Sequence, residues 1–181
     1  MSPDEYAGNA HVHTPSSDGT GLHGEIAAAA GRAGLDFVII TDHNVYVEGV
    51  EGYYDDVLLL VGEELHDVRR RPQADHLLAY GAETELAPLA FSPQTVIDGA
   101  NEAGGMCFLA HPFERGSKVG SDLDPIDWES WDVDGYAGME IWNYMSEFKG
   151  LLRGKLWALL YAHYPGIGIR GPYRITLDKW D

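Results

Sequence analysis

The chain has 181 residues, of which 45% are apolar and 23% charged, which is enough for one globular domain with a substantial core. Its formal net charge of −17 argues against a nucleic-acid surface or an anionic membrane as a partner. The apolar runs are far shorter than a membrane span and the acidic start lacks the features of a signal peptide, so we expect a cytoplasmic protein. The lone Cys107 lies in an apolar run, which predicts a small core residue.

Strands alternate with helices or loops along most of the chain. Residues 6–13 predict a strand, and residues 21–34 predict a helix with an apolar stripe that ends at Gly34. A continuous apolar strand at 36–41 is typical of a buried parallel sheet, and residues 45–56 predict a loop. The later predicted elements are strands at 57–61, 75–80, 106–110 and 136–142, helices at 92–103 and 148–163, and loops at 66–74 and 114–134.

Side chains that can bind metal recur where the predicted strands end. They are His11 and His13 on the first strand, then His43, Glu64 and His111, with His76 at the start of its strand as the exception. Parallel strands that alternate with helices predict an α/β layer or barrel, in which the C-terminal ends of the strands carry the chemistry. Five strands that each contribute an imidazole or a carboxylate predict a polynuclear metal site.

The stretch at 11–19, H-V-H-T-P-S-S-D-G, begins this site. His11 and His13 are two residues apart on a strand and therefore point to the same side, within reach of one cation. Asp18 returns a carboxylate to the same neighbourhood from a turn rich in serine, proline and glycine. Imidazole and carboxylate ligands suit Zn, Mn or Fe ions. Taken alone, so short a motif is equally compatible with a surface loop.

Five motifs in a fixed order resemble a known family. They are H-x-H-T-x-x-S-D-G at 11–19, T-D-H at 41–43, G-x-E at 62–64, H-L-L at 76–78 and H-P at 111–112, and together they are similar to the polymerase-and-histidinol-phosphatase (PHP) domains. The sequence E-I-W-N at 140–143 resembles the compact metal-dependent phosphoesterases and the CehA/McbA-type hydrolases within that family. The resemblance extends from residue 9 to residue 143.

The resemblance implies a distorted seven-stranded β/α (TIM-like) barrel of the α/β class that holds two to three divalent cations at one end. Carried over to this chain, the implied ligands are His11, His13 and Glu64 for a first metal, Glu64, His76 and His111 for a second, and Asp18 and His43 for a third. Glu64 is preferred to Glu63 because Gly62 sets the register of the G-x-E motif. Glu63 is then expected to point away from the metals.

One motif of the family is missing. Its members finish with a late strand that bears a D-x-H pair, which completes the first and third metal sites, and nothing after His111 fits this pattern. The later His163 lies in a predicted apolar helix and is expected to be structural. We therefore expect a single domain over residues 1–181 whose barrel is incomplete at its C-terminal end, either because the last strand is lost or because the chain is a piece of a longer protein.

Two further residues are candidates for catalytic work. Arg115, four residues past His111, has the forked donors that suit a substrate phosphate, although a loop charge explains it equally well. Glu140 lies near the rim of the site that the resemblance implies, with either an active-site or a structural role. Ser117 and Lys118 are weaker candidates for contact with a phosphate.

The expected function is metal-dependent hydrolysis of a small-molecule phosphate mono- or diester. Clustered divalent ions make hydroxide available near neutral pH and neutralise charge on the phosphoryl oxygens. An ester, carbamate or amide substrate is an alternative, because hydroxide also attacks carbonyl carbon. A non-catalytic metal-binding PHP domain is a second alternative, which the missing D-x-H pair favours. The sequence predicts no particular oligomeric state.

Overall fold

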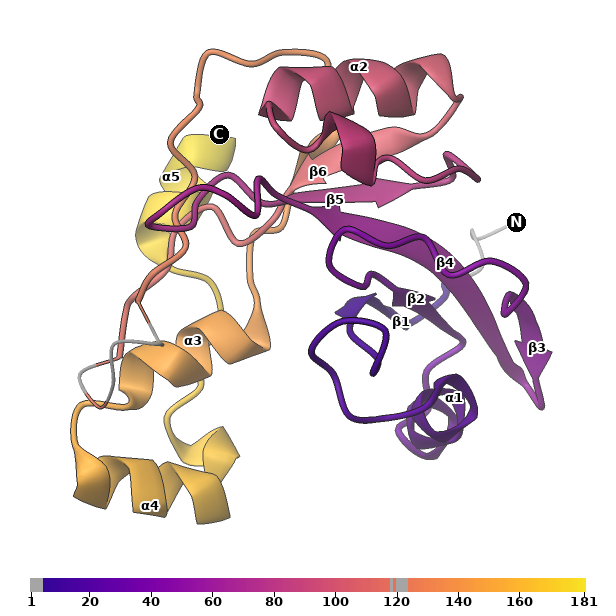
Figure 1. The fold of residues 1–181 in the computed structure, drawn as a ribbon. Helices are drawn as coiled ribbons and strands as arrows, with labels where there is room; N and C mark the ends of the chain where they lie inside the picture. Colours follow the sequence, from indigo (N-terminus) through magenta and orange to yellow (C-terminus); the bar gives the residue numbers. More distant parts are fainter. Residues whose placement is uncertain (1–4, 118, 120–123) are drawn as a thin grey trace.

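The structure is a computed structural model that describes residues 5–117, 119 and 124–181 (Figure 1). Within these residues a mixed sheet curls into an open half-barrel with the strand order β1-β2-β4-β5-β6-β7, and β3 pairs with β4. The strands are β1 Gly8–Val12, β2 Phe37–Ile40, β3 Gly52–Tyr54, β4 Val57–Leu65, β5 Leu77–Tyr80, β6 Met106–Leu109 and β7 Gly138–Met139. The described strands therefore form one curved layer with β1 and β7 at its edges, and not a closed barrel.

Helices α1 and α2 cover the sheet, each over its own core, and α3 and α4 lie together to one side (Figure 1). The helices are α1 His23–Arg32, α2 Pro93–Glu102, α3 Tyr144–Leu151, α4 Lys155–His163 and α5 Arg174–Trp180, with short 3-10 turns at Ala87–Leu89 and Pro165–Ile167. The core beneath α2 includes Cys107, which is fully buried as predicted. In the described part of the chain, no helix has both the length and the apolar character that crossing a bilayer requires.

Strand β4 joins the two halves of the sheet. Its first half pairs in parallel with β2, and its second half pairs antiparallel with β5. Val57, Leu59 and Val61 belong to the core beneath α1, and Leu65 belongs to the core beneath α2. Because alternate side chains of a strand point to opposite faces, the odd-numbered residues of β4 face the helices and the even-numbered Glu64 faces the concave side of the sheet.

Strand β5 runs opposite to both of its neighbours. The alternating sequence pattern predicts parallel strands throughout, and this prediction is wrong for β5, which pairs antiparallel with β4 and with β6. The N-terminal end of β5 therefore lies at the same edge of the sheet as the C-terminal ends of β4 and β6. This reversal explains why His76, at the start of its strand, reaches the same edge as Glu64 and His111.

Three other elements differ from their predictions. The predicted loop at 45–56 contains β3, which pairs antiparallel with β4. The predicted helix at 148–163 is two helices, because the backbone leaves helical geometry at Leu152 (ψ 69°) and Gly154 (φ 171°). The predicted strand at 136–142 is reduced to the two residues of β7, because only these pair with β6.

Two glycines allow the backbone to approach itself closely around the concave side. At Gly62, on β4, an added Cβ atom would lie 2.4 Å from the carbonyl oxygen of Ala79 on β5. At Gly19 the added atom would lie 2.1 Å from the carbonyl oxygen of His13, because the turn after β1 folds back onto its own start. Backbone atoms cannot move aside as the end of a flexible side chain can. Close packing of the backbone therefore requires glycine at both positions, in the G-x-E motif and in the S-D-G motif.

Replacement of Gly62 by alanine tests this close approach. We expect Gly62→Ala to lower the free energy of unfolding by about 2–3 kcal/mol, because the Cβ atom forces β4 and β5 apart. Urea unfolding followed by circular dichroism measures the change. The control is Gly166→Ala, where the added atom meets open space and the change is expected to stay within about 0.5 kcal/mol. Equal stability of the two variants would contradict the described packing.

Candidate metal centre

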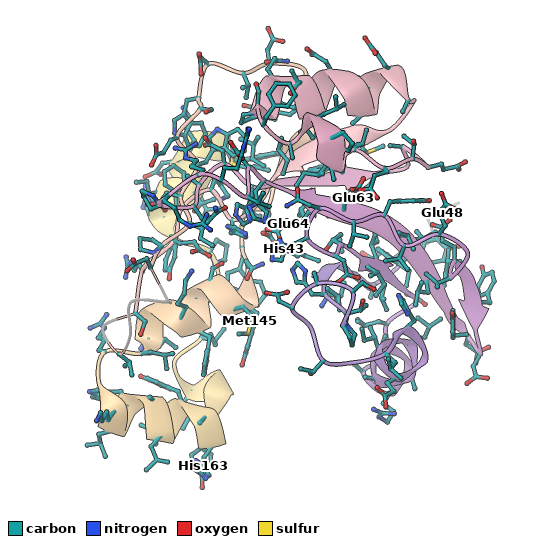
Figure 2. All side chains as sticks on the ribbon, in the orientation of Figure 1. His43, Glu48, Glu63, Glu64, Met145 and His163 are labelled. Carbon is teal, nitrogen blue, oxygen red and sulfur yellow. The ribbon has the colours of Figure 1, made fainter. Side chains whose placement is uncertain are left out.

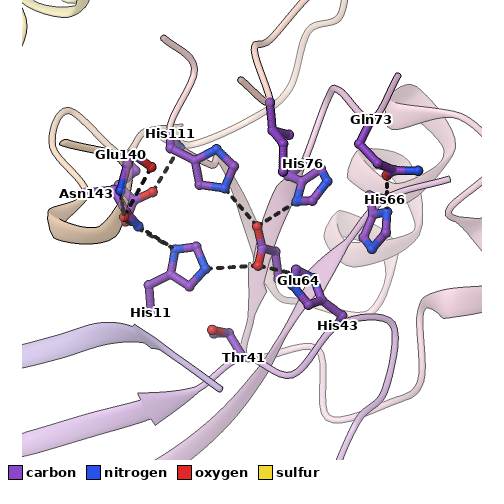
Figure 3. Close-up of polar contacts among 12 residues, drawn as sticks. His11, Thr41, His43, Glu64, His66, Gln73, His76, His111, Glu140 and Asn143 are labelled. Carbon is purple, nitrogen blue, oxygen red and sulfur yellow. Dashed lines mark hydrogen bonds and ion pairs between the residues drawn. The ribbon is translucent and has the colours of Figure 1, made fainter. Parts of the chain in front are cut away.

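A ring of five histidines surrounds the buried carboxylate of Glu64, and Figure 3 labels four of them, His11, His43, His76 and His111. Its Oε2 atom lies 3.0 Å from His11 Nε2, 3.2 Å from His13 Nε2 and 3.3 Å from His43 Nδ1. The three imidazoles come from the ends of β1 and β2. One carboxylate oxygen is therefore shared among three ring nitrogens.

The other oxygen of Glu64 faces a second group of histidines. Its Oε1 atom lies 2.8 Å from His76 Nδ1 and 3.0 Å from His111 Nε2. These imidazoles come from the start of β5 and the end of β6. The two oxygens thus contact different imidazoles, so that the carboxylate of Glu64 would contribute to holding more than one cation.

The sheet brings the residues that carry these side chains to one edge. Strands β1, β2, β4 and β6 deliver theirs at their C-terminal ends, and β5 delivers His76 at its N-terminal end because it is reversed. A backbone bridge between His43 and Glu64 extends the parallel pairing of β2 and β4 into the site. Strand register therefore brings the residues that carry the donor atoms to one edge of the sheet.

The donor atoms have the spacing of ligands around a cation. His11 Nε2 and His13 Nε2 lie 3.1 Å apart and contact the same carboxylate oxygen, whereas ligands about 2.0–2.1 Å from a tetrahedral cation lie about 3.3 Å from one another. Within the described residues, buried ring nitrogens without a hydrogen-bond partner occur in four histidines of the ring, His13, His43, His76 and His111, and in His23 outside it. Three triplets whose donor atoms all lie within 4.8 Å of one another are His11–Glu64–His111, His13–Asp18–His43 and His43–Glu64–His76. The residues therefore fit divalent metal ions.

Asp18 lies on the open side of the ring. Its carboxylate oxygens lie 3.7 Å from His13 Nδ1 and 3.7 Å from His43 Nε2, which is too long for hydrogen bonds but compatible with a shared cation. Its side chain is 68% exposed, whereas that of Glu64 is 2% exposed. The structure thus brings all seven predicted ligands together, and the group around Asp18 is the most open to solvent.

Burial and mutual contact shift the protonation of the ring. Burial alone would raise the pKa of Glu64, but the imidazoles around it, His11 above all, hold the pKa well below its usual range. Burial alone would lower the pKa of His11, but the carboxylates of Glu64 and Glu140 raise it to about 10. At His76 burial dominates and lowers the pKa. A cation that binds Nε2 of His11 must therefore displace a proton.

Glu140, a predicted catalytic candidate, orients two of the histidines. Its Oε1 atom lies 3.2 Å from His11 Nδ1, and its Oε2 atom accepts a 2.8 Å hydrogen bond from the backbone N–H of His111. His111 has a φ of 27°, which is strained for a residue other than glycine, and this hydrogen bond holds that conformation. The Asn143 side chain donates a 3.0 Å hydrogen bond to Oε1 of the same carboxylate.

Asp42, the middle residue of the T-D-H motif, anchors the turn that follows β1. It is fully buried. It accepts hydrogen bonds of 2.7 Å from Thr14 N–H, 2.6 Å from Thr14 Oγ1 and 2.6 Å from Ser17 Oγ. These bonds fix the turn that carries His13 and Asp18. The motif drew attention to Asp42, but only the structure reveals its partners.

The adjacent Glu63 and Glu64 have opposite surroundings (Figure 2). Glu63 points toward the core beneath α2, where its Oε2 atom accepts a 2.8 Å hydrogen bond from Leu86 N–H and the residue is 1% exposed. Burial raises the pKa of the Glu63 carboxyl to about 8, although the Leu86 hydrogen bond opposes this effect. The structure places Glu64, and not Glu63, among the histidines.

The other predicted candidates lie outside the ring. The Arg115 guanidinium lies 4.5 Å from the centre of the Tyr173 ring, and in the described part of the chain no hydrogen bond or ion pair joins it to the histidines. Ser117 donates a 2.9 Å hydrogen bond to a backbone carbonyl after α3. Lys118 lies outside the described residues. His163 lies at the end of α4, far from the ring (Figure 2).

His66 adjoins the ring although its sequence position predicted only a loop. Its imidazole stacks on that of His76 with 4.2 Å between ring centres, and it meets the His43 ring edge-on at 5.1 Å. Its Nδ1–H donates a 2.6 Å hydrogen bond to Gln73 Oε1 (Figure 3). The amide nitrogen of Gln73 donates to two backbone carbonyls of the loop, which fixes this orientation. The sequence did contain one indication of this position: His66 is two residues after Glu64, and alternate residues of a strand point to the same face.

Comparisons with known proteins found similar folds among solved structures. No protein-family model matches the chain, and no curated protein matches it. The chain is similar to a solved two-domain protein from Bacteroides vulgatus that contains a predicted PHP-like metal-dependent phosphoesterase, with 20% identity and a TM-score of 0.46 over 75% of this chain and 44% of that chain. It is also similar to a solved protein from Bifidobacterium adolescentis that is provisionally named a metal-dependent phosphoesterase, with 16% identity and a TM-score of 0.50 over 98% of this chain and 96% of that chain.

These likenesses concern the fold. At 16% identity, the second structure shows that the two chains share their architecture. The chain spans less than half the length of the Bacteroides protein, at 44%.

The buried Glu63 makes stability depend on pH. A carboxyl with a pKa of about 8 in the folded protein, against an ordinary value of 4.5, holds its proton more tightly when folded. The free energy of unfolding therefore falls as the pH rises from about 4.5 to about 8. We expect Glu63→Gln, which cannot titrate, to become progressively more stable relative to the natural protein over this interval.

Urea unfolding at several pH values in the presence of a chelator measures this difference, because the chelator excludes any contribution from metal release. The control is Glu102→Gln, which changes an exposed glutamate at the end of α2. The same pH profile for Glu63→Gln and the natural protein would show that Glu63 is ionised in the folded state.

Proposed function

We propose that this protein is a metal-dependent phosphoesterase of the PHP superfamily. The observation that carries the proposal is the shared carboxylate of Glu64, with its two oxygens facing two separate groups of histidines. The order of the five sequence motifs supports the same assignment. The fold likeness to the Bifidobacterium protein, provisionally named a metal-dependent phosphoesterase, also supports it.

Seven residues would hold two to three cations. The sequence motifs assign His11, His13 and Glu64 to the first, Glu64, His76 and His111 to the second, and Asp18 and His43 to the third. The three groups of donor atoms that lie within 4.8 Å of one another combine the same residues differently, as His11–Glu64–His111, His13–Asp18–His43 and His43–Glu64–His76. This donor set suits Zn, Mn or Fe. When bound, such ions would supply hydroxide near neutral pH and would neutralise the charge that develops on phosphoryl oxygens.

The protein itself would contribute orientation and proton control. The contact of Glu140 with His11 Nδ1 favours a proton on that atom, which leaves Nε2 free to bind a cation. Glu140 is thus a positioning residue that acts through His11 and His111. The Arg115 guanidinium lies over the Tyr173 ring, a contact that leaves its in-plane N–H donors available to a substrate phosphate.

Metal analysis combined with a phosphatase assay tests the proposal. We expect protein supplied with Mn or Zn to bind two to three ions per chain and to hydrolyse a chromogenic phosphate mono- or diester. We expect Glu64→Gln to lose bound metal and to lower kcat/KM by more than about 100-fold, because one carboxylate serves two groups of ligands.

The matched control is Glu63→Gln, which makes the same chemical change on the opposite face of β4 and should retain both metal and activity. Full metal binding without turnover of any phosphate ester would contradict the proposal in favour of a non-catalytic domain. Turnover of carboxylic esters, carbamates or amides alone would move the protein to another class of hydrolase.

Removal of the Glu140 side chain tests its positioning role. We expect Glu140→Ala to weaken metal binding by about 10- to 100-fold, because His11 and the backbone of His111 lose the group that orients them. Titration with a fluorescent metal competitor measures the affinity, and Glu102→Ala on the surface of α2 is the control. An unchanged affinity together with a lowered melting temperature would indicate that Glu140 serves only the fold.

A further inference from the structure

A cavity of ≈ 300 Å³ lies beside the candidate metal centre, between the loop that follows β4 and the start of α2. Its lining includes four core side chains, Leu65, Leu77, Ala90 and Val96, and four charged residues, Asp67, Arg69, Arg70 and Asp75. His66 and Phe91 also line it, and Phe91 is 57% exposed. Its volume is that of a small-molecule pocket, and none of the seven candidate metal ligands lines it.

His66 is the wall between the cavity and the histidine ring. It lines the cavity, and its imidazole stacks on that of His76 with 4.2 Å between ring centres (Figure 3). Because His66 borders both, one imidazole separates the cavity, which lies toward the core beneath α2, from the histidine ring on the concave side of the sheet. The hydrogen bond to Gln73 holds this wall in place before any ligand binds, which lowers the entropic cost of binding.

The two arginines that line the cavity are already paired with carboxylates. Arg70 forms ion pairs with Asp75 and Glu129, and Arg69 forms one with Asp67. Both guanidinium groups are therefore already neutralised, and a second anionic group on a ligand would gain little from either of them. The formal net charge of −17 further disfavours a polyanion.

We propose that this cavity is the subsite for the alcohol portion of the substrate, and that the substrate is a phosphate ester of an uncharged, apolar or aromatic alcohol. The inference rests on the proposed phosphoesterase function, because it places the phosphate at the histidine ring. Hydrolysis adds water across the P–O bond, so the alcohol leaves from the cavity and inorganic phosphate leaves from the ring. The subsite would thus select among esters by the apolar area of their alcohol.

Binding of two phosphonates to the metal-loaded protein tests the subsite without turnover. Phenylphosphonate presents an aromatic group to the cavity and methylphosphonate does not. We expect calorimetry to show that phenylphosphonate binds about 10- to 100-fold more tightly, because the apolar walls of the cavity would take apolar area of the phenyl ring out of water.

Variants of the cavity wall test where this preference arises. Ala90→Leu fills the cavity and should reduce the preference to less than about 3-fold, whereas the control Ala103→Leu, at an exposed position after α2, should retain it. Phe91→Ala removes an exposed aromatic wall at little risk to folding and should also reduce the preference. Each variant should keep the metal content of the natural protein.

The outcomes separate this inference from the proposed function. A preference that survives both Ala90→Leu and Phe91→Ala overturns the subsite, and so does equal or undetectable binding of the two phosphonates. Hydrolysis of phosphate esters alongside such a result leaves the phosphoesterase function intact. A preference that disappears in Ala90→Leu, in a protein that hydrolyses no phosphate ester, supports the subsite and contradicts the phosphoesterase function.

Discussion

An ionised carboxylate taken out of water has to be compensated, and the candidate site is organised around that requirement at Glu64. Removal of such a charge from water costs several kcal/mol unless partners surround it, and here five imidazoles lie within 3.3 Å of its two oxygens. Those imidazoles cannot all be protonated, because the nitrogens of His11 and His13 lie only 3.1 Å apart. A divalent cation would satisfy both constraints, because it neutralises the carboxylate and accepts the lone pairs of neutral imidazoles. This balance of charge is the physical argument for metal at this edge of the sheet.

The environment on each side of β4 separates two chemically identical neighbours. Glu64 faces imidazoles and stays ionised, whereas Glu63 faces apolar side chains and has a raised pKa. The same alternation places Gly62 on the concave face. There the backbone of β5 lies so close that a Cβ atom would not fit. Strand geometry thus determines packing, protonation and the donor set together.

Much of this arrangement could be predicted from the sequence, because residues that end strands meet at one edge and motif spacing preserves their order. Five of the candidate ligands were named on that basis, Asp18 was named from the turn after His13 and His76 from the start of its strand, and the structure brings all seven together. The direction of β5 was not predictable, since a short apolar run carries no mark of parallel or antiparallel pairing. The hydrogen bonds of Asp42 and the stacking of His66 on His76 depend on contacts between distant segments, which local patterns do not encode. The break between α3 and α4 was missed because the leucines on both sides continue an apolar pattern.

The contact between His11 and Glu140 joins β1 and β7, which are the two edges of the half-barrel and are 129 residues apart in sequence. A contact of such long range closes a large loop, and its entropic cost places it late in folding. The cores beneath α1 and α2 are built from shorter segments and need no such closure. A cation held by the ring would act as a reversible cross-link between the edge strand β1 and the strands β4 to β6, and its loss would loosen β1 before either helix-covered core.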